Sequence, residues 1–422
     1  MRLYRLPDEF FPVICCNTSM RILIVATSSR GGAGIAAWRS FSALRNSGEN
    51  VSFLSLDGGN SKEFEKRGWL KFNILIFARK SITYLQRVFV QRDARLFTGI
   101  SFNFLTRGYK NLEEKFDVIH FHATYNLANI DTFREFANKG KTLVFTMHDE
   151  RLATGGCHYS GTCHQLKTGC HKCPIARPFF QSIAVNSLKQ SSKFMNSHIS
   201  VVVTAPSNWL VRRAEISPVM SGKKIEIINN PIPDYFFQLK EAEKFVAKAP
   251  IKVGFISQDL WNPYKGFKDL VSAIGELDQQ SQSLVQLRIA TSTKDVKLPN
   301  WVKYELSHPR TDQDLLSFYR EIDVLIVPSI EDNSPSVIGE SLASGTPVIG
   351  SSAGGIPELL ELFNQPTFEK GNSHSIAEVL RELLSEGPGS VDIELVKKHL
   401  GEKRYVERTL DLYRSHFNAR YS

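Results

Sequence analysis

Short apolar segments alternate along the chain with longer segments of helical periodicity. The first, residues 21–26, is apolar at almost every position, which is typical of a strand buried on both faces of a sheet. Strands that alternate with helices in this way predict an α/β fold with mostly parallel sheets covered by helices. We expect strands at residues 21–26, 51–56, 118–122, 142–146, 199–204 and 225–228, and a second series at residues 251–256, 285–290, 324–327 and 347–350.

Residues 229–233 (NNPIP) interrupt this alternation, and a charged stretch follows to Pro250. We therefore predict two Rossmann-like, doubly wound domains, residues 20–235 and 250–400, which face each other across a cleft. Residues 401–422 are predicted to form a helix that packs back on the first domain. Helices of the second domain are expected at residues 266–277, 312–320, 335–344, 356–362 and 375–385.

Residues 1–19 contain Asp8, Glu9 and two prolines but no apolar core of a signal peptide. We interpret them as a peripheral tail or a mis-assigned start, with Met20 as the alternative start. No apolar run approaches the ~20 residues that cross a bilayer. These features predict a protein of the reducing cytoplasm.

The net charge of +9 is concentrated in residues 62–110, where 11 lysines and arginines face only three acids. One interpretation is a core-facing helix with a solvated basic face. The other is a helix on an anionic membrane surface, at the inner face of the cell membrane. Nucleic acid is disfavoured as a partner, because the charge is local and no reader motif is present.

A glycine loop, Gly31-Gly32-Ala33-Gly34, follows the first strand and opens a helix. Three interpretations fit it. It matches the dinucleotide fingerprint, with Asp57 as the acid after the second strand, which would make the protein an NAD-dependent enzyme. It also suits another phosphate or sugar contact, or a plain tight turn.

The densest motif runs from Pro328 to Gly350 and is completed by residues 353–358 (AGGIPE). A strand is predicted to end in a polar loop, with a helix starting near Pro335. Open N–H groups there suit phosphate or sugar oxygens. Glu340, about 1.5 turns into the helix, suits the vicinal diol of a ribose.

This segment resembles the donor half of retaining, family-four-type glycosyltransferases of the GT-B fold. In that family a first acid contacts the donor sugar, and a second acid eight residues later contacts the donor ribose. Here Asp332 stands at the first position, where the family has Glu, and Glu340 at the second. The resemblance implies that Asp332, Asn333, Ser334, Ser336 and Glu340 bind the donor.

Other segments resemble the same family. Lys265-Gly266 is similar to its Lys-Gly motif, whose lysine binds donor phosphate, although the arginine that often precedes it is absent. Gly31 and Gly32 resemble its donor-facing loop, and the strand that ends at His122 resembles one that lines the cleft. The resemblance thus implies His122, Lys265 and Asp332 as catalytic residues. No Asp-x-Asp motif stands out at a strand end, so we expect no metal cofactor in catalysis.

Four cysteines fall within an insert at residues 148–174. They are Cys157, Cys163, Cys170 and Cys173, with one C-x-x-C spacing. A similar insert is familiar from a subgroup of polysaccharide-assembly glycosyltransferases. A structural zinc ion, disulfides and unligated thiols are all compatible with the spacing; a glycine-rich loop with little core favours zinc.

Together these features predict a retaining glycosyltransferase. It would move a sugar from a nucleotide-sugar donor to a growing polysaccharide or a lipid-linked oligosaccharide. The alternative is a nucleotide-sugar epimerase or an NAD-dependent enzyme that uses the first glycine loop.

Overall fold

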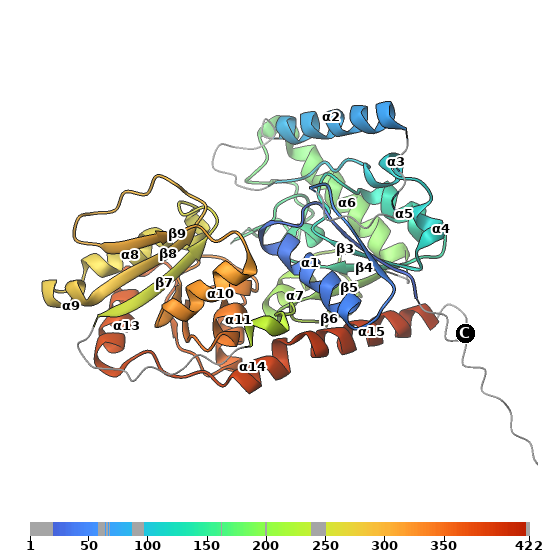
Figure 1. The fold of residues 1–422 in the computed structure, drawn as a ribbon. Coiled ribbons are helices and arrows are strands. Elements are labelled where there is room, and N and C mark those ends of the chain that lie inside the picture. The colour runs from blue at the N-terminus through green and yellow to red at the C-terminus, as the bar shows by residue number, and fades with distance from the viewer. Residues whose placement is uncertain are drawn as a thin grey trace, which may run out of the picture.

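The computed structural model describes residues 20–57, 64, 66, 68–86, 97–161, 163–198, 201–237 and 250–418. The predicted tail, residues 1–19, lies outside them, as do five of the cations in residues 62–110. Two six-stranded sheets form the framework, and all their strand pairs are parallel. Each sheet lies between helices, and the two domains lie side by side (Figure 1). The predicted fold class is confirmed.

The first sheet has the order β2-β1-β3-β4-β5-β6. Its strands are β1 (Ile22–Ala26), β2 (Val51–Leu54), β3 (Val118–His122), β4 (Thr142–Thr146), β5 (Val201–Ala205) and β6 (Ile225–Ile227). Its helices are α1 (Gly31–Asn46), α2 (Trp69–Gln86), α3 (Leu105–Gly108), α4 (Leu112–Lys115), α5 (Ile130–Asn138), α6 (Gln181–Ser197) and α7 (Asn208–Glu215). Strands β1 to β5 are apolar on both faces because helices cover the sheet on both sides.

The second sheet has the order β12-β11-β10-β7-β8-β9. Its strands are β7 (Ile251–Ser257), β8 (Val285–Thr291), β9 (Lys303–Ser307), β10 (Val324–Val327), β11 (Val348–Ser351) and β12 (Thr367–Phe368). Its helices are α8 (Phe267–Gly275), α9 (Gln279–Leu284), α10 (Asp312–Glu321), α11 (Ser336–Ala343), α12 (Ile356–Leu362), α13 (Ser373–Glu386) and α14 (Ile393–Leu400). The two edge strands, β9 and β12, are absent from the sequence-based expectation, because β9 is half exposed and polar and β12 has two residues.

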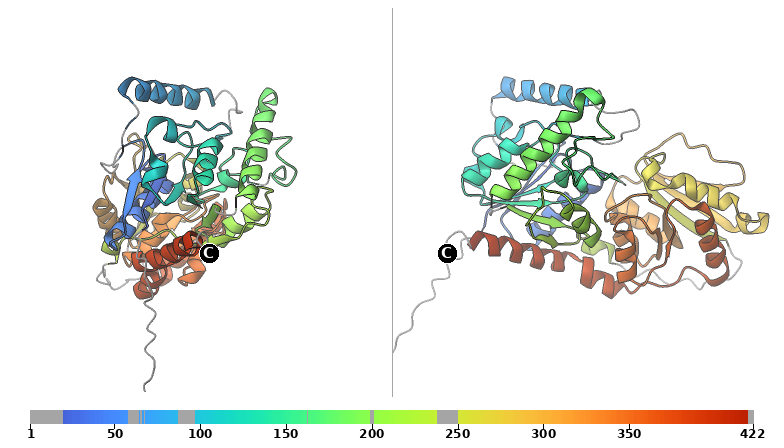
Figure 2. Two further views of the ribbon diagram at one scale, coloured as in Figure 1. Left: turned by 90° about the vertical axis from the view of Figure 1, so that its right-hand side faces the viewer. Right: turned by 180° about the vertical axis from the view of Figure 1, so that it is seen from behind.

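The last helix, α15 (Glu402–Asn418), leaves the second domain and runs along the first, as two views show (Figures 1 and 2). Tyr405 and Tyr413 on this helix are buried in one apolar cluster with Phe53 and Val144 of the first sheet. The Tyr413 hydroxyl also hydrogen-bonds Nδ1 of His120 at 2.6 Å. Burial of two large aromatic side chains, each contributing about 1.5–3 kcal/mol, ties this helix to the first domain.

Candidate active site

Lys265 and Asp332, both implied by the family resemblance, meet at the carboxyl edge of the second sheet. Nζ of Lys265 donates to Oδ2 of Asp332 at 2.6 Å. Lys265 ends a short 3₁₀ helix (Pro263–Lys265) after β7, and Asp332 lies in the loop between β10 and α11. Both side chains remain partly open to solvent, at 34% and 14%. Lys265 therefore keeps N–H donors for a further anion such as a phosphate.

Gly266 brings these two loops together. Its φ of +67° lies in the left-handed region, and a Cβ there would stand 1.8 Å from the carbonyl oxygen of Pro328. Gly354 acts in the same way from the next loop, where a Cβ would lie 1.7 Å from the carbonyl oxygen of Asp332. Only glycine fits such approaches. Glycine is thus required at both positions, because the loops that contain Gly266 and Gly354 pack directly against the backbone of the loop after β10.

Asn333 connects the donor motif to the first domain. Its side chain is buried, hydrogen-bonds the Ser207 hydroxyl, and donates from Nδ2 to the carbonyl oxygen of His148 at 3.2 Å. Glu358 makes a second connection, since its carboxylate accepts the backbone N–H groups of Asn208 and Trp209 at the start of α7. Ser334 and Ser336 are half-buried where the chain enters α11. The structure therefore uses Asn333 as a link between the domains.

Glu340 is buried and paired. One carboxylate oxygen accepts from Nη1 of Arg39 at 2.6 Å, and the other accepts from the Tyr319 hydroxyl at 2.6 Å. Burial acts to lower the pKa of Arg39, but the carboxylates of Glu340 and Asp312 raise it overall. A donor ribose could reach Glu340, which is 4% exposed, only if the Arg39 side chain moved.

The single Asp-x-Asp sequence of the chain, Asp312-Gln313-Asp314, begins α10. Asp312 pairs with Nη2 of Arg39 at 3.2 Å and hydrogen-bonds the Tyr235 hydroxyl. Asp314 completes a capping box with Thr311. Both carboxylates thus have structural partners.

His122 lies in the interior, behind the surface that faces the second domain. It ends β3, is 1% exposed, and its Nδ1 lies 2.9 Å from Nε2 of His148. Burial, together with repulsion from His120 and His148, holds its pKa well below the ordinary value. The sequence-based expectation placed His122 in the cleft. In the structure His148, after β4, is the more exposed of the two and the one that the second domain contacts.

Gly31 and Gly32 open α1, and neither would bring a Cβ within 4 Å of another atom. The loop before them is held by Asp57, whose carboxylate accepts from the Ser28 and Ser55 hydroxyls and from the Ser29 N–H. Although burial opposes it, these hydrogen bonds hold the pKa of Asp57 below its usual value. Asp57 thus fixes the residues before the glycine loop. The space that a Cβ at Gly31 or Gly32 would occupy, at the start of α1, is free of other atoms of the described chain.

The cysteine insert contacts the second domain. The ring of Tyr159 stacks on that of Tyr264 with centroids 5.0 Å apart, directly before Lys265. Cys170 and Cys173 are buried in the core of the first domain, and Cys157 packs against them. Burial raises the pKa of Cys157 to about 12. Among the residues that the structure describes, no three His, Cys, Asp or Glu side chains are arranged to hold a metal ion, so zinc stays a prediction.

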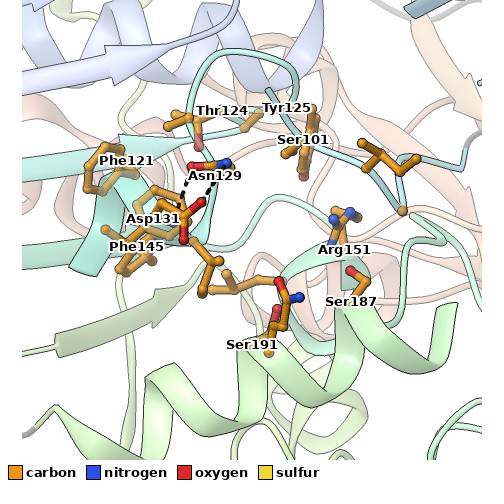
Figure 3. Close-up of a pocket in the computed structure, with 18 of the residues that line it drawn as sticks. Ser101, Phe121, Thr124, Tyr125, Asn129, Asp131, Phe145, Arg151, Ser187 and Ser191 are labelled. Atoms are coloured by element: carbon orange, nitrogen blue, oxygen red, sulfur yellow. Dashed lines mark hydrogen bonds between the residues drawn. The ribbon is translucent and has the colours of Figure 1, made fainter. Parts of the chain in front are cut away.

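A cavity of about 370 Å³ opens in the first domain beside His148. Phe121 and Phe145 line one side of it (Figure 3), and Phe133 is also part of the lining. Its polar lining comes from the loop after β3, the first turn of α5, the segment after β4 and α6: Thr124, Asn129, Asp131, Asp149, Arg151, Asn186, Ser187, Gln190 and Ser191. Sequence reasoning missed this cavity, because its lining is assembled from four separate segments; the only available signal was the position of Asp149 after a strand.

Asp149 fixes the positions of neighbouring residues that line the cavity, through hydrogen bonds of its carboxylate. Its carboxylate accepts from the Tyr125 hydroxyl at 2.9 Å and from the Arg151 N–H at 2.9 Å, and lies 2.7 Å from Nδ1 of His158. Burial acts to raise the pKa of Asp149, but these partners lower it overall. The residue before it is His148, so the cavity wall continues directly into the contact with the second domain.

Comparison with known proteins agrees with this architecture. Residues 250–386 match the family model "Glycosyl transferases group 1". Over 263 residues the chain is 23% identical to WcaC of Escherichia coli (strain K12), a glycosyl transferase assigned to colanic acid biosynthesis; the match covers 58% of this chain and 62% of that protein. An uncharacterised glycosyltransferase of Methanocaldococcus jannaschii is 27% identical over 142 residues, covering 33% and 38%. The matches thus span less than two thirds of either relative.

Solved structures share the fold over nearly the whole chain. Anabaena HepE in complex with UDP-glucose superposes with a TM-score of 0.55 at 13% identity, covering 94% of this chain and all of that one. Sucrose-phosphate synthase of Thermosynechococcus elongatus gives 0.59 at 14% identity, covering 95% and 100%. The chain therefore has the two-domain GT-B fold of these structures, and its residues 250–386 match the glycosyl transferases group 1 family.

Proposed function

We propose that this protein is a retaining glycosyltransferase that moves a sugar from a nucleotide donor to a growing polysaccharide or a lipid-linked oligosaccharide. The observation that carries the proposal is the Lys265–Asp332 pair at the carboxyl edge of the second sheet. Ligands of open α/β sheets bind at this edge. HepE, which shares the fold, is described in complex with UDP-glucose.

Lys265 would stabilise the charge of the leaving group, and Asp332 would position Lys265 for that role. A nucleotide sugar leaves as a diphosphate, so negative charge develops as the glycosidic bond breaks. The Lys265 ammonium would stabilise that charge, while the carboxylate of Asp332 holds the ammonium in place. Retention follows from attack on the face that the diphosphate leaves, with the diphosphate taking the acceptor proton.

The acceptor would enter the cavity of the first domain. Aromatic side chains on one wall and amide, hydroxyl and charged groups on the others suit a sugar, which has both apolar faces and polar edges. The cavity adjoins His148, whose carbonyl oxygen contacts Asn333 of the donor motif. Contact with an anionic membrane, where a lipid-linked acceptor lies, belongs to the same proposal.

The alternative, an epimerase or NAD-dependent enzyme, would need Asp57 for a ribose diol. In the structure that carboxylate accepts hydrogen bonds from Ser28 and Ser29, just before the glycine loop. The geometry therefore favours a nucleotide-sugar transferase over the alternative.

A binding and transfer experiment tests the proposal. Purified protein is screened for a shift in melting temperature with UDP- and GDP-sugars and with NAD. We expect a nucleotide sugar to raise the melting temperature and NAD to leave it unchanged. Lys265→Ala should then lower transfer by about 100-fold or more, the scale of losing one charge stabiliser.

Lys268→Ala is the matched control, since Lys268 is an exposed lysine three residues away on α8. It should leave transfer unchanged. Full transfer by the Lys265→Ala protein, or stabilisation by NAD alone, would contradict the proposal.

A further inference from the structure

Helix α2 carries apolar side chains on two opposite faces. Phe72, Leu75 and Ile76 pack against the core of the first domain. The other face holds six large apolar residues that are at least 50% exposed: Trp69, Leu70, Ile74, Phe77, Tyr84 and Leu85. A surface helix of a globular protein normally has one apolar stripe. The second stripe therefore lacks a partner within the described part of the chain.

The exposed stripe has cations at its edges. At about 100° per residue, Leu70, Ile74, Phe77 and Tyr84 fall on one side of the helix. Lys71 and Lys80, both exposed, fall on its two flanks, and the helix contains no acidic residue. An apolar stripe between lysines is typical of a helix that lies in the plane of a membrane surface.

The position of α2 permits such contact. Figures 1 and 2 show the helix along the outer side of the first domain, away from the second domain. No described helix is long and apolar enough to cross a bilayer. A bilayer could therefore meet the exposed face of α2 without obstruction from the second domain.

We propose that α2 docks in the plane of an anionic lipid bilayer. Leu70, Ile74 and Phe77 enter the boundary between headgroups and acyl chains, and Lys71 and Lys80 meet the lipid phosphates. A second copy of the chain fits less well, because two such faces would bring lysines together without an acid from either helix. The inference rests on the proposed function, since docking would bring the acceptor cavity to a lipid-linked substrate.

Vesicle binding tests this directly. Full-length protein is sedimented with phosphatidylcholine vesicles that contain or lack phosphatidylglycerol. We expect binding to the anionic vesicles only, weakening as salt rises. Emission of Trp69, which is 81% exposed, should shift to the blue on binding, and Trp69→Phe should remove most of that shift.

Two double variants address the two parts of the surface. Lys71→Glu/Lys80→Glu and Leu70→Ser/Phe77→Ser should each weaken vesicle binding roughly tenfold or more. Lys294→Glu/Lys297→Glu, on exposed lysines of the second domain, makes the same charge change and should bind as wild type. Circular dichroism checks that each variant is folded. If the serine variant unfolds, vesicle binding by the glutamate variant still tests the inference.

Three results would overturn the inference. They are equal binding to neutral and anionic vesicles, unchanged binding by the glutamate variant, and a concentration-dependent dimer that Leu70→Ser/Phe77→Ser abolishes. Transfer to a water-soluble acceptor distinguishes this failure from that of the proposed function. If that transfer persists while vesicle binding fails, the docking inference alone is wrong.

Discussion

Nη1 of Arg39 lies 2.6 Å from Oε1 of Glu340, which joins α1 of the first domain to α11 of the second. Both side chains are almost fully buried, at 3% and 5% exposure. A buried ion pair loses much of its Coulomb energy to desolvation, but removal of one partner leaves an uncompensated charge. The pair thus adds a buried contact between the domains, made by two residues 301 positions apart.

Removing one member of this pair should destabilise the protein. We expect Arg39→Ala to lower the free energy of unfolding by about 3–5 kcal/mol, because Glu340 would stay buried with its charge unpaired. Urea unfolding measures this. Arg45→Ala, on the exposed side of the same helix, is the control and should cost below about 1 kcal/mol. Equal stability of the two variants would show that the pair contributes little.

Stability should fall in acid because of three interior histidines. Burial, together with repulsion from His148, lowers the pKa of His120 to about 3, and burial lowers that of His148 to about 4. Burial also holds the pKa of His122 well below its ordinary value. An unfolded histidine has a pKa of about 6.5. The unfolded chain therefore binds more protons than the native one below that pH, and stability is lost as the pH falls from about 6.5 towards 4.

Urea midpoints between pH 7.5 and 5 check this prediction. Each histidine contributes up to about 1.4 kcal/mol per pH unit within that window. His120→Gln should reduce the slope of unfolding free energy against pH by the contribution of one histidine, up to about 1.4 kcal/mol per pH unit. A wild-type slope near zero would contradict the prediction.

Filling the cavity of the first domain tests whether it is the acceptor site that we propose. Ser187 lines the cavity from α6, and Ser187→Trp would occupy much of it. We expect acceptor use to fall about tenfold or more while the donor-induced shift in melting temperature stays unchanged. Lys189→Trp, exposed on the same helix and outside the cavity, is the control. Unchanged acceptor kinetics in Ser187→Trp would argue against this cavity as the acceptor site.

Metal analysis tests the zinc prediction for Cys157, Cys163, Cys170 and Cys173. Mass spectrometry of untagged, freshly purified protein should find about one zinc per chain, lost in Cys170→Ser and kept in Cys16→Ser. Without metal, the high pKa of Cys157 keeps its thiol protonated and slow to alkylate. Absence of zinc would leave the four residues as unligated thiols, of which Cys170 and Cys173 are buried.

The sequence by itself determined the fold class, because short apolar runs between helical segments can be buried only as inner strands of covered parallel sheets. It also determined the local geometry of the donor motif. Gly266 and Gly354 stand where the backbone admits no Cβ, and such a requirement is visible as a glycine in the chain.

Only the tertiary structure decided which of these groups are exposed and which are paired. Nothing near Glu340 in sequence indicates that Arg39 covers it, or that His122 lies buried behind His148. The cavity of the first domain likewise draws its lining from four segments between Gly99 and Ser191. Local sequence patterns indicate which residues are buried. A contact between distant segments depends instead on how the two sheets and α15 pack against each other, and that packing is a property of the whole chain.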